Sequence, residues 1–272
     1  MMKCLASMTE LGSPPWKNFM AELNQVAEQC GLDRYDTFSR VWEYPWLWSQ
    51  LEPFKGAGLE LLDIGSERSP LPWFLATQGF RVTVSDHTIN SWSAWQNAKQ
   101  RLQIAIRRRL LDAQQLNLPT ASTDIYLSVS VIEHFSGKEQ ALAEAARVLR
   151  PNGLLIMSFD ICEAQLGMSF PEWNGRALTT REFDELFDGC GWFEPGLATL
   201  PWNTGDIPAY LAWHRETAPW HNYVTGAAVV RRTNAPWKEA LWKDALRVTK
   251  GNARTAYRAL RWQWEQRKSS AS

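Results

Sequence analysis

The stretch from residue 59 to residue 86 constrains the fold of this chain more than any other. It contains two short apolar runs, one ending at Asp63 before Gly65 and the other ending at Asp86. Such runs are typical of buried parallel strands that meet tight turns. The segment between them has the signals of a helix. The pattern therefore predicts a strand, turn, helix and strand, with an acid at the end of each strand.

The helix in this unit has a recognisable start and stop. Ser69 is a good N-cap, Pro70 suits the first helical position, and Gly79 provides an end. A glycine turn that leads into a helix binds a polar or anionic ligand group, and an acid after the second strand binds ribose hydroxyls. We expect a ligand that contains a ribose. An ordinary strand–helix–strand unit with a turn glycine is the alternative, because the full G-x-G-x-x-G pattern is absent.

Composition narrows the classes of protein. The chain has 272 residues and no net charge, which suits one large α/β domain with additions, or two small ones, and provides no overall field to attract nucleic acid. Its four cysteines include no C-x-x-C pair, so we expect no disulfide framework, no zinc site and a reducing, cytoplasmic setting. We also expect no signal peptide and no membrane span. The 16 Trp residues suit either core packing or an apolar pocket.

The rest of the chain continues the alternation of strands and helices, which predicts a doubly wound, mostly parallel sheet. We expect helices over residues 16–30, 69–79, 89–103, 138–149 and 180–188, and strands over residues 59–64, 80–86, 104–112, 124–132, 154–159 and 223–231, with one more strand beginning at residue 192. Thr179 and Glu182 have the spacing of a capping box for one of these helices. Residues 1–15 are predicted to lack regular structure.

Three parts are expected along the chain. Residues 1–54 form a helical prefix, residues 55–232 form the α/β domain with an insertion around 202–222, and residues 233–272 form a basic helical tail. The aromatic segment 35–48 either covers the strand ends as a lid or packs on the sheet as one of a helix pair. The tail is either a nucleic-acid or lipid contact or an ordinary solvated helix face.

Several motifs, taken in order, point to one family. They are residues 61–65, Asp86, residues 112–119, residues 128–135 and residues 147–154. With these motifs, the chain resembles the class I S-adenosylmethionine-dependent methyltransferases of the small-molecule type. The resemblance implies a Rossmann-like, seven-stranded sheet, S-adenosylmethionine as cofactor, and methyl transfer to a small-molecule acceptor.

The resemblance also implies which residues bind the cofactor. They are Asp63, Gly65, Ser66, Arg68, Asp86, His87, Asp112, Ala113 and Ser128. This chain departs from the family where further glycines usually follow the first, because Ser66, Glu67 and Arg68 stand there. Side chains at these positions are expected to crowd the methionine end of the cofactor. Arg68 is expected to pair with the cofactor carboxylate or with Glu67.

Methyl transfer is an in-line displacement, in which the protein aligns the acceptor and excludes water. A hydroxyl acceptor also needs a base, and the candidates are His134, Asp160 and His214. His134 has a second interpretation, in which it orients the helix that follows. Glu133 is expected to bind backbone N–H groups. Some relatives have an acid at the position of Ser130, so we expect no catalytic metal here.

Aromatic residues in the variable segments are expected to meet the acceptor. They are Tyr44, Trp46, Trp173, Trp202 and Trp213. Their rings suit a sugar, a lipid-linked precursor or a secondary metabolite. Two other functions compete with this one: an NAD-dependent oxidoreductase, and a methyltransferase-like protein that binds RNA or a protein partner through its basic tail. The sequence does not set the oligomeric state, and a homodimer is compatible with it.

Overall fold

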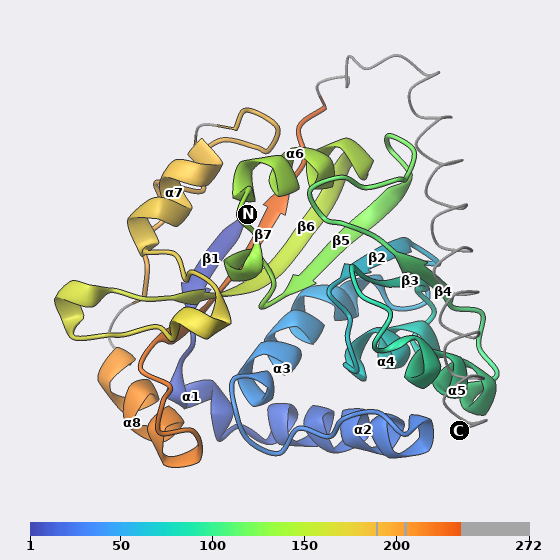
Figure 1. Cartoon of the computed structure of the whole chain (residues 1–272), viewed down its shortest axis with the longest axis horizontal. Coiled ribbons are helices and arrows are strands. Elements are labelled where there is room, and N and C mark those ends of the chain that lie inside the picture. The colour runs from blue at the N-terminus through green and yellow to red at the C-terminus, as the bar shows by residue number, and fades with distance from the viewer. Residues whose placement is uncertain (189, 204–205, 235–272) are drawn as a thin grey trace, which may run out of the picture.

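A computed structural model describes residues 1–188, 190–203 and 206–234. These residues contain a seven-stranded sheet in the order β1-β7-β6-β5-β2-β3-β4 (Figure 1). The strands are β1 (Met2–Leu5), β2 (Glu60–Ile64), β3 (Arg81–Asp86), β4 (Arg107–Leu110), β5 (Thr123–Val129), β6 (Leu149–Ile161) and β7 (Val224–Arg231). Strands β2 to β6 are parallel to one another, and β7 is antiparallel to both of its neighbours. The prediction of a mostly parallel, doubly wound sheet is confirmed.

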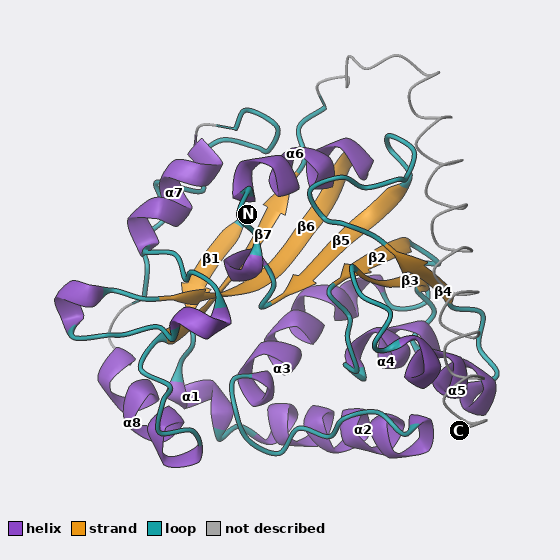
Figure 2. Cartoon of the chain, viewed as in Figure 1, coloured by secondary structure: helices purple, strands orange, loops and turns teal. Residues whose placement is uncertain are grey.

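Helices cover both sides of this sheet. They are α1 (Met8–Leu11), α2 (Pro14–Cys30), α3 (Arg40–Leu51), α4 (Leu71–Thr77), α5 (Trp92–Leu102), α6 (Lys138–Val148), α7 (Thr180–Asp188) and α8 (Ile207–Thr217), with short 3₁₀ turns η1 (Glu52–Phe54), η2 (Ile132–His134), η3 (Ala164–Leu166) and η4 (Glu172–Asn174). Figure 2 shows α6 and α7 on one side and α2 to α5 on the other. Most of the predicted basic tail lies outside the described residues.

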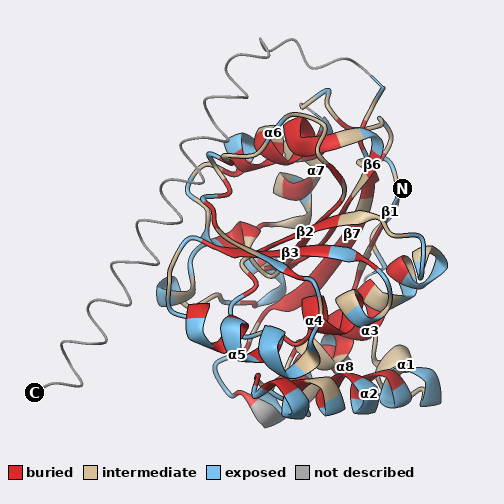
Figure 3. Cartoon of the chain, turned by 90° about the vertical axis from the view of Figure 1, so that its right-hand side faces the viewer, coloured by how far each residue is buried: buried red, intermediate tan, exposed pale blue. Residues whose placement is uncertain are grey.

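The local signals explain most of these elements. Gly31 ends α2 with a φ of 68°, as expected for a left-handed cap. The capping box of α7 is also present, because the Glu182 amide donates to Thr179 Oγ1 at 3.0 Å while the Thr179 amide donates to Glu182 Oε2 at 2.9 Å. The central strands are buried, as Figure 3 shows. The arginine-rich strand β4 lies at the edge of the sheet, where Arg107 pairs with Glu60.

The two ends of the expected sheet need correction. Residues 1–15, predicted to be irregular, contain β1, which pairs antiparallel with β7 through Met2–Val229 to Leu5–Gly226. The strand predicted from residue 192 is wrong, because Phe193 forms only an isolated bridge with Arg232 in the part of the chain described. The N-terminal strand therefore occupies the sheet edge beside β7.

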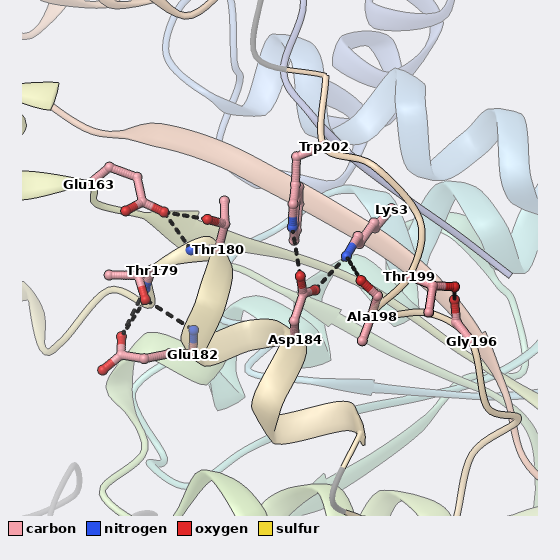
Figure 4. A network of polar contacts seen from close by, with 10 residues as sticks. All are labelled: Lys3, Glu163, Thr179, Thr180, Glu182, Asp184, Gly196, Ala198, Thr199 and Trp202. Carbon is pink, nitrogen blue, oxygen red and sulfur yellow. Dashed lines mark hydrogen bonds and ion pairs between the residues drawn. The ribbon is translucent and has the colours of Figure 1, made fainter. Parts of the chain in front are cut away.

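A buried lysine fixes β1 against α7 and the segment before α8 (Figure 4). The Lys3 side chain has no exposed surface, and its Nζ donates to Asp184 Oδ1 at 2.5 Å and to the Ala198 carbonyl at 3.2 Å. The Trp202 ring lies under the same ammonium at 4.8 Å, and its Nε1 donates to Asp184 Oδ2 at 3.2 Å. Because this cation is desolvated, its partners are needed to keep β1 in place.

Helix α3 connects the prefix to the sheet. It contacts β6 and β7 on one side and α2 on the other, and Figure 1 shows it beside the arrowhead of β5. Pro45 lies inside the helix, and the buried rings of Trp42 and Trp46 stack at 5.9 Å. The arrangement agrees with the interpretation of this segment as a helix packed on the sheet.

We predict that the Lys3–Asp184 pair contributes measurably to stability. Asp184→Ala should lower the free energy of unfolding by about 3 kcal/mol, because removing one partner strands a buried charge. Glu185→Ala is the matched control, since its pair with Arg181 is exposed and screened by solvent and should contribute little to stability. Urea unfolding followed by tryptophan fluorescence measures both. Equal losses for the two variants would contradict the prediction.

Candidate active site

The turn after β2 lies at the edge of the sheet where β2 and β3 each carry an acid near their carboxyl ends. Gly65 has a φ of 70°, and a Cβ atom built on it would lie 2.7 Å from Val131 Cγ2. A larger residue would therefore be both strained and too close to the segment after β5. Glycine at residue 65 therefore allows both the positive φ of the turn and the close packing of the Val131 side chain against it.

The turn works without the further glycines because Ser66 points into the protein. Its amide donates to the Ser85 carbonyl at 2.9 Å, its hydroxyl donates to the Asp63 carboxylate, and the Ser85 amide donates to that hydroxyl at 3.1 Å. Ser66 is only 2% exposed. The expectation that this side chain would crowd a ligand is therefore corrected, since it joins β2 to β3 instead.

Arg68 also differs from expectation. Its Nε donates to Asp33 Oδ1 at 2.7 Å and its Nη2 donates to the Gly31 carbonyl at 3.1 Å. The guanidinium is thus directed to the segment after α2 and forms no described ion pair with Glu67. Arg68 attaches the N-terminal prefix to the loop between β2 and α4.

The two strand-end acids have different surroundings. Asp63 is buried, and burial first and then the charge of Asp86 raise its pKa to about 7. Asp86 is also buried, and its Oδ1 accepts from the Thr88 amide at 2.8 Å and the Thr88 hydroxyl at 3.1 Å. The side chain of His87 is exposed, and its Nδ1 lies 3.3 Å from the same oxygen. Asp86 is therefore held in one orientation at the end of β3.

The third cofactor segment follows β4. Asp112 is exposed, and its Oδ1 accepts from the Gln114 amide at 2.9 Å, while Ala113 is buried. The loop behind them is held by Arg147, which donates to the carbonyls of Leu116 and Leu118 at 2.8 Å each. The buried Arg147 also pairs with Glu144 on the same helix. Sequence reasoning placed Arg147 only in a turn motif; its i, i+3 spacing from Glu144 was the available signal.

A second group of buried acids lies at the ends of β5 and β6. Glu43 of α3 has no exposed surface, and its Oε1 accepts from Ser130 Oγ at 2.5 Å and Ser158 Oγ at 2.6 Å. Arg40 pairs with its other oxygen. Burial alone would raise the pKa of Glu43, but Arg40 and the two hydroxyls hold it below its usual value. Sequence reasoning missed this pair, which the Arg-x-x-Glu spacing within an aromatic helix signalled.

Glu133 and Asp160 complete this group. Both are buried, and their carboxyl groups face one another within hydrogen-bonding reach. Burial, together with neighbouring carboxylates, raises the pKa of Glu133 to about 7 and that of Asp160 well above its usual value. Apart from Asp160 and the main-chain N–H of residue 133 itself, no described group lies close enough to donate to the Glu133 oxygens. The expectation that Glu133 binds backbone N–H groups stays a prediction.

The structure separates the histidine candidates. His134 is exposed on η2, and burial of part of its ring, with the charges of Arg40 and Lys138, lowers its pKa. His214 has no exposed surface and lies in an aromatic cluster, 4.1 Å from His221 between ring centroids. Burial lowers the pKa of His214 to about 4. Of the two, only His134 is open at the strand ends.

The five aromatic residues expected to meet the acceptor do not form one group. Tyr44 donates to Ser69 Oγ at 3.0 Å beside the turn, whereas Trp46 lies in the core and Trp202 lies in the Lys3 cluster. Trp213 stacks on His214 and lines a cavity of about 520 Å³ between α2 and the segment before α3. Trp173 is 72% exposed and contacts Trp220.

Ser128 and Ser130 continue the same edge. Ser128 is buried in β5 opposite Ile64, and Ser130, one residue beyond the strand, has a φ of 48°. The position at which some relatives carry an acid is thus a serine that donates to Glu43. The described residues contain no group of three His, Cys, Asp or Glu side chains arranged to hold a metal ion.

Comparisons with known proteins agree with this geometry. Residues 62–157 match the family model described as a methyltransferase domain. Two proteins named ubiquinone biosynthesis O-methyltransferase are similar in sequence: that of Paramagnetospirillum magneticum is 31% identical over 108 residues, and that of a Caulobacter species is 35% identical over 109 residues. The aligned part is 40% and 39% of this chain, respectively, and spans 42% of each relative, so less than half of their length is matched.

Solved structures show the same fold at low identity. A geranyl diphosphate methyltransferase in complex with GPP and sinefungin has a TM-score of 0.58 at 12% identity, covering 82% of this chain and all of that one. A putative sarcosine dimethylglycine methyltransferase from Galdieria sulphuraria has a TM-score of 0.53 at 15% identity, covering 70% and 85%. The [4+2]-cyclase SpnF is as similar, with a TM-score of 0.55 at 18% identity, covering 79% and 94%. Residues 62–157 of this chain thus match a methyltransferase domain, and the fold is similar to that of solved methyltransferase structures.

Proposed function

We propose that this protein transfers a methyl group from S-adenosylmethionine to an oxygen atom of a small-molecule acceptor. The observation that supports it most is the meeting of the Gly65 turn, Asp86 and Asp112 at one edge of adjacent parallel strands. Ligands of open α/β sheets bind at this edge. The names of the two sequence relatives favour oxygen as the methylated atom.

The residues present fit this cofactor. Gly65 gives the turn a positive φ without a side chain of its own, and the Asp86 carboxylate is already oriented by Thr88. Asp86 would take the ribose hydroxyls, and Asp112 would take the adenine amino group. When bound, the cofactor supplies a methyl group activated by a positively charged sulfur. The protein then needs only to align the acceptor, exclude water and accept its proton.

His134 is the proposed proton acceptor for the acceptor hydroxyl. Its lowered pKa keeps the ring neutral at neutral pH, so one ring nitrogen is free to take a proton. Gly175 packs over it so closely that a Cβ there would lie 3.2 Å from Nδ1 and 2.6 Å from the Glu133 carbonyl. The loop after β6 therefore limits the space in which the acceptor meets the imidazole.

The acceptor itself is proposed only by class. A sugar, a lipid-linked precursor and a secondary metabolite each carry a hydroxyl that suits this site. The described residues include no helix long and apolar enough to cross a membrane. The four cysteines are free, which favours a reducing compartment such as the cytoplasm.

Cofactor binding is tested first by calorimetry. S-adenosylmethionine and S-adenosylhomocysteine should bind to the protein and NAD should not. Asp86→Ala should weaken binding of both sulfur nucleotides by about 1–3 kcal/mol, because a charged hydrogen-bond acceptor is lost.

The control for this test is Asp124→Ala. Asp124 lies at the start of β5, at the opposite edge of the sheet, where it pairs with Arg150. This variant should keep wild-type affinity. Unchanged affinity in Asp86→Ala would remove the ribose assignment, and no binding of either sulfur nucleotide to wild type would overturn the proposed function.

The role of His134 predicts a pH dependence of turnover. The base must be neutral, so kcat should fall as the pH is lowered through its folded pKa, which lies below the usual value. His134→Gln should lower kcat by about 10²–10³-fold and abolish this acidic limb. The readout is S-adenosylhomocysteine formed with a panel of phenols, sugars and hydroxylated metabolites. Glu139→Gln, an exposed change on α6, is the control; an unchanged limb in His134→Gln would show that another group accepts the proton.

A further inference from the structure

The Glu133–Asp160 pair has no role in the chemistry described so far. Glu133 lies four residues after the end of β5, and Asp160 is the penultimate residue of β6. They are 2% and 5% exposed, and apart from Asp160 and the main-chain N–H of residue 133 itself no described group donates to the Glu133 oxygens. The main chain is fixed, because the Arg176 amide donates to the Glu133 carbonyl at 2.9 Å. Two carboxyl groups in such a site can hydrogen bond to each other only when one carries a proton.

The buried carboxyl groups around the pair outnumber the cations that face them. Three carboxyl groups, Glu43, Glu133 and Asp160, are buried together, and Arg40 is the cation from α3 that faces them. Arg40 donates to Glu43 and to Ser130, so it is paired outside the Glu133–Asp160 contact.

The other neighbouring groups do not supply the missing charge. Lys138 of α6 directs its ammonium to the carbonyls of Ile132 and Phe135, at 2.8 and 3.1 Å. Tyr210 of α8 shares a hydrogen bond with Thr225, and burial first and then Asp160 and Glu133 raise the pKa of Tyr223, so both phenols stay neutral. Without a ligand, a proton shared between the two carboxyl groups lowers the electrostatic cost of burying them together.

The position of the pair indicates which ligand would replace that proton. Val131 lies two residues before Glu133 and packs directly against Gly65, the turn residue of the cofactor site. The segment that leads to Glu133 therefore starts against the proposed cofactor turn. A neutral ligand would leave the negative charge uncompensated, whereas a cation would stabilise both carboxylates.

We propose that Glu133 and Asp160 are the counter-charge for the sulfonium of bound S-adenosylmethionine, and that they release their shared proton when this cation binds. The inference rests on the proposed function, because it takes S-adenosylmethionine as the cofactor. The released proton passes to the buffer, and no other bond forms or breaks. S-adenosylhomocysteine, whose sulfur is neutral, leaves the proton on the pair.

Calorimetry in two buffers tests this exchange without an acceptor. Titrations in phosphate and in Tris, which differ in ionisation enthalpy, give the number of protons released per ligand bound. The two nucleotides share the same ribose, adenine, amine and carboxylate, so the difference between them reports the sulfonium alone. Near neutral pH, S-adenosylmethionine should release more protons than S-adenosylhomocysteine. This excess should shrink as the pH is raised, and it should vanish once the free pair has itself lost its proton.

Two variants locate the source of the proton. Glu133→Gln should abolish the excess proton release, because the remaining carboxylate has an amide donor and no longer needs a shared proton. The double variant Glu133→Gln with Asp160→Asn removes the charge altogether. It should lower the preference for S-adenosylmethionine over S-adenosylhomocysteine by about tenfold, equivalent to one pKa unit. Glu139→Gln on the exposed face of α6 should behave as wild type.

The outcomes separate this inference from the proposed function. Equal proton release with both nucleotides in wild type, or undiminished excess release in Glu133→Gln, would overturn the counter-charge role while leaving the cofactor assignment intact. Failure of both nucleotides to bind wild type would overturn the proposed function itself. Retained affinity for S-adenosylhomocysteine shows that each variant is folded, and Asp160→Asn provides the same single-site test if Glu133→Gln loses that affinity.

Discussion

The buried ion pair between Arg40 and Glu43 is the interaction on which the arrangement of the site depends. A carboxylate without solvent contact is costly unless its charge is paired and its oxygens accept hydrogen bonds. Glu43 meets this requirement through Arg40 and the hydroxyls of Ser130 and Ser158. Ser130 follows β5 and Ser158 lies within β6. The pairing therefore fixes α3 against the ends of two central strands.

The turn after β2 shows how a site can keep its geometry while its sequence changes. Glycines after a turn avoid side-chain crowding, but Ser66 avoids it by directing its hydroxyl into the β2–β3 contact. Glu67 adopts a φ of 39°, the left-handed conformation in which glycine is usual. Arg68 is drawn outward by Asp33. The residues that departed from the family pattern therefore stabilise the turn and join it to the prefix.

Sequence patterns predicted the elements whose signals are local. The capping box at Thr179, the helix end at Gly31 and the strand before Gly65 all depend on neighbouring residues, and each is present. Strand β1 was missed because a short edge strand is decided by its partner, here β7 at more than 200 residues' separation. The buried Arg40–Glu43 pair was missed for the same reason, since the spacing within α3 does not show that Glu43 meets Ser158. Local sequence patterns therefore predicted the residues of the proposed cofactor edge, but they did not predict the contacts between distant segments.

The division between matched and unmatched residues limits what relatives can say about the acceptor. The matched stretch, residues 62–157, contains Gly65, Asp86 and Asp112, which form the proposed cofactor edge. Glu43, Asp160 and the aromatic cluster around His221 lie outside it. A cyclase shares the same fold, so the fold alone does not fix the reaction. The acceptor must therefore be inferred from the unmatched segments of this chain, which supply Glu43, Asp160 and the aromatic cluster around His221.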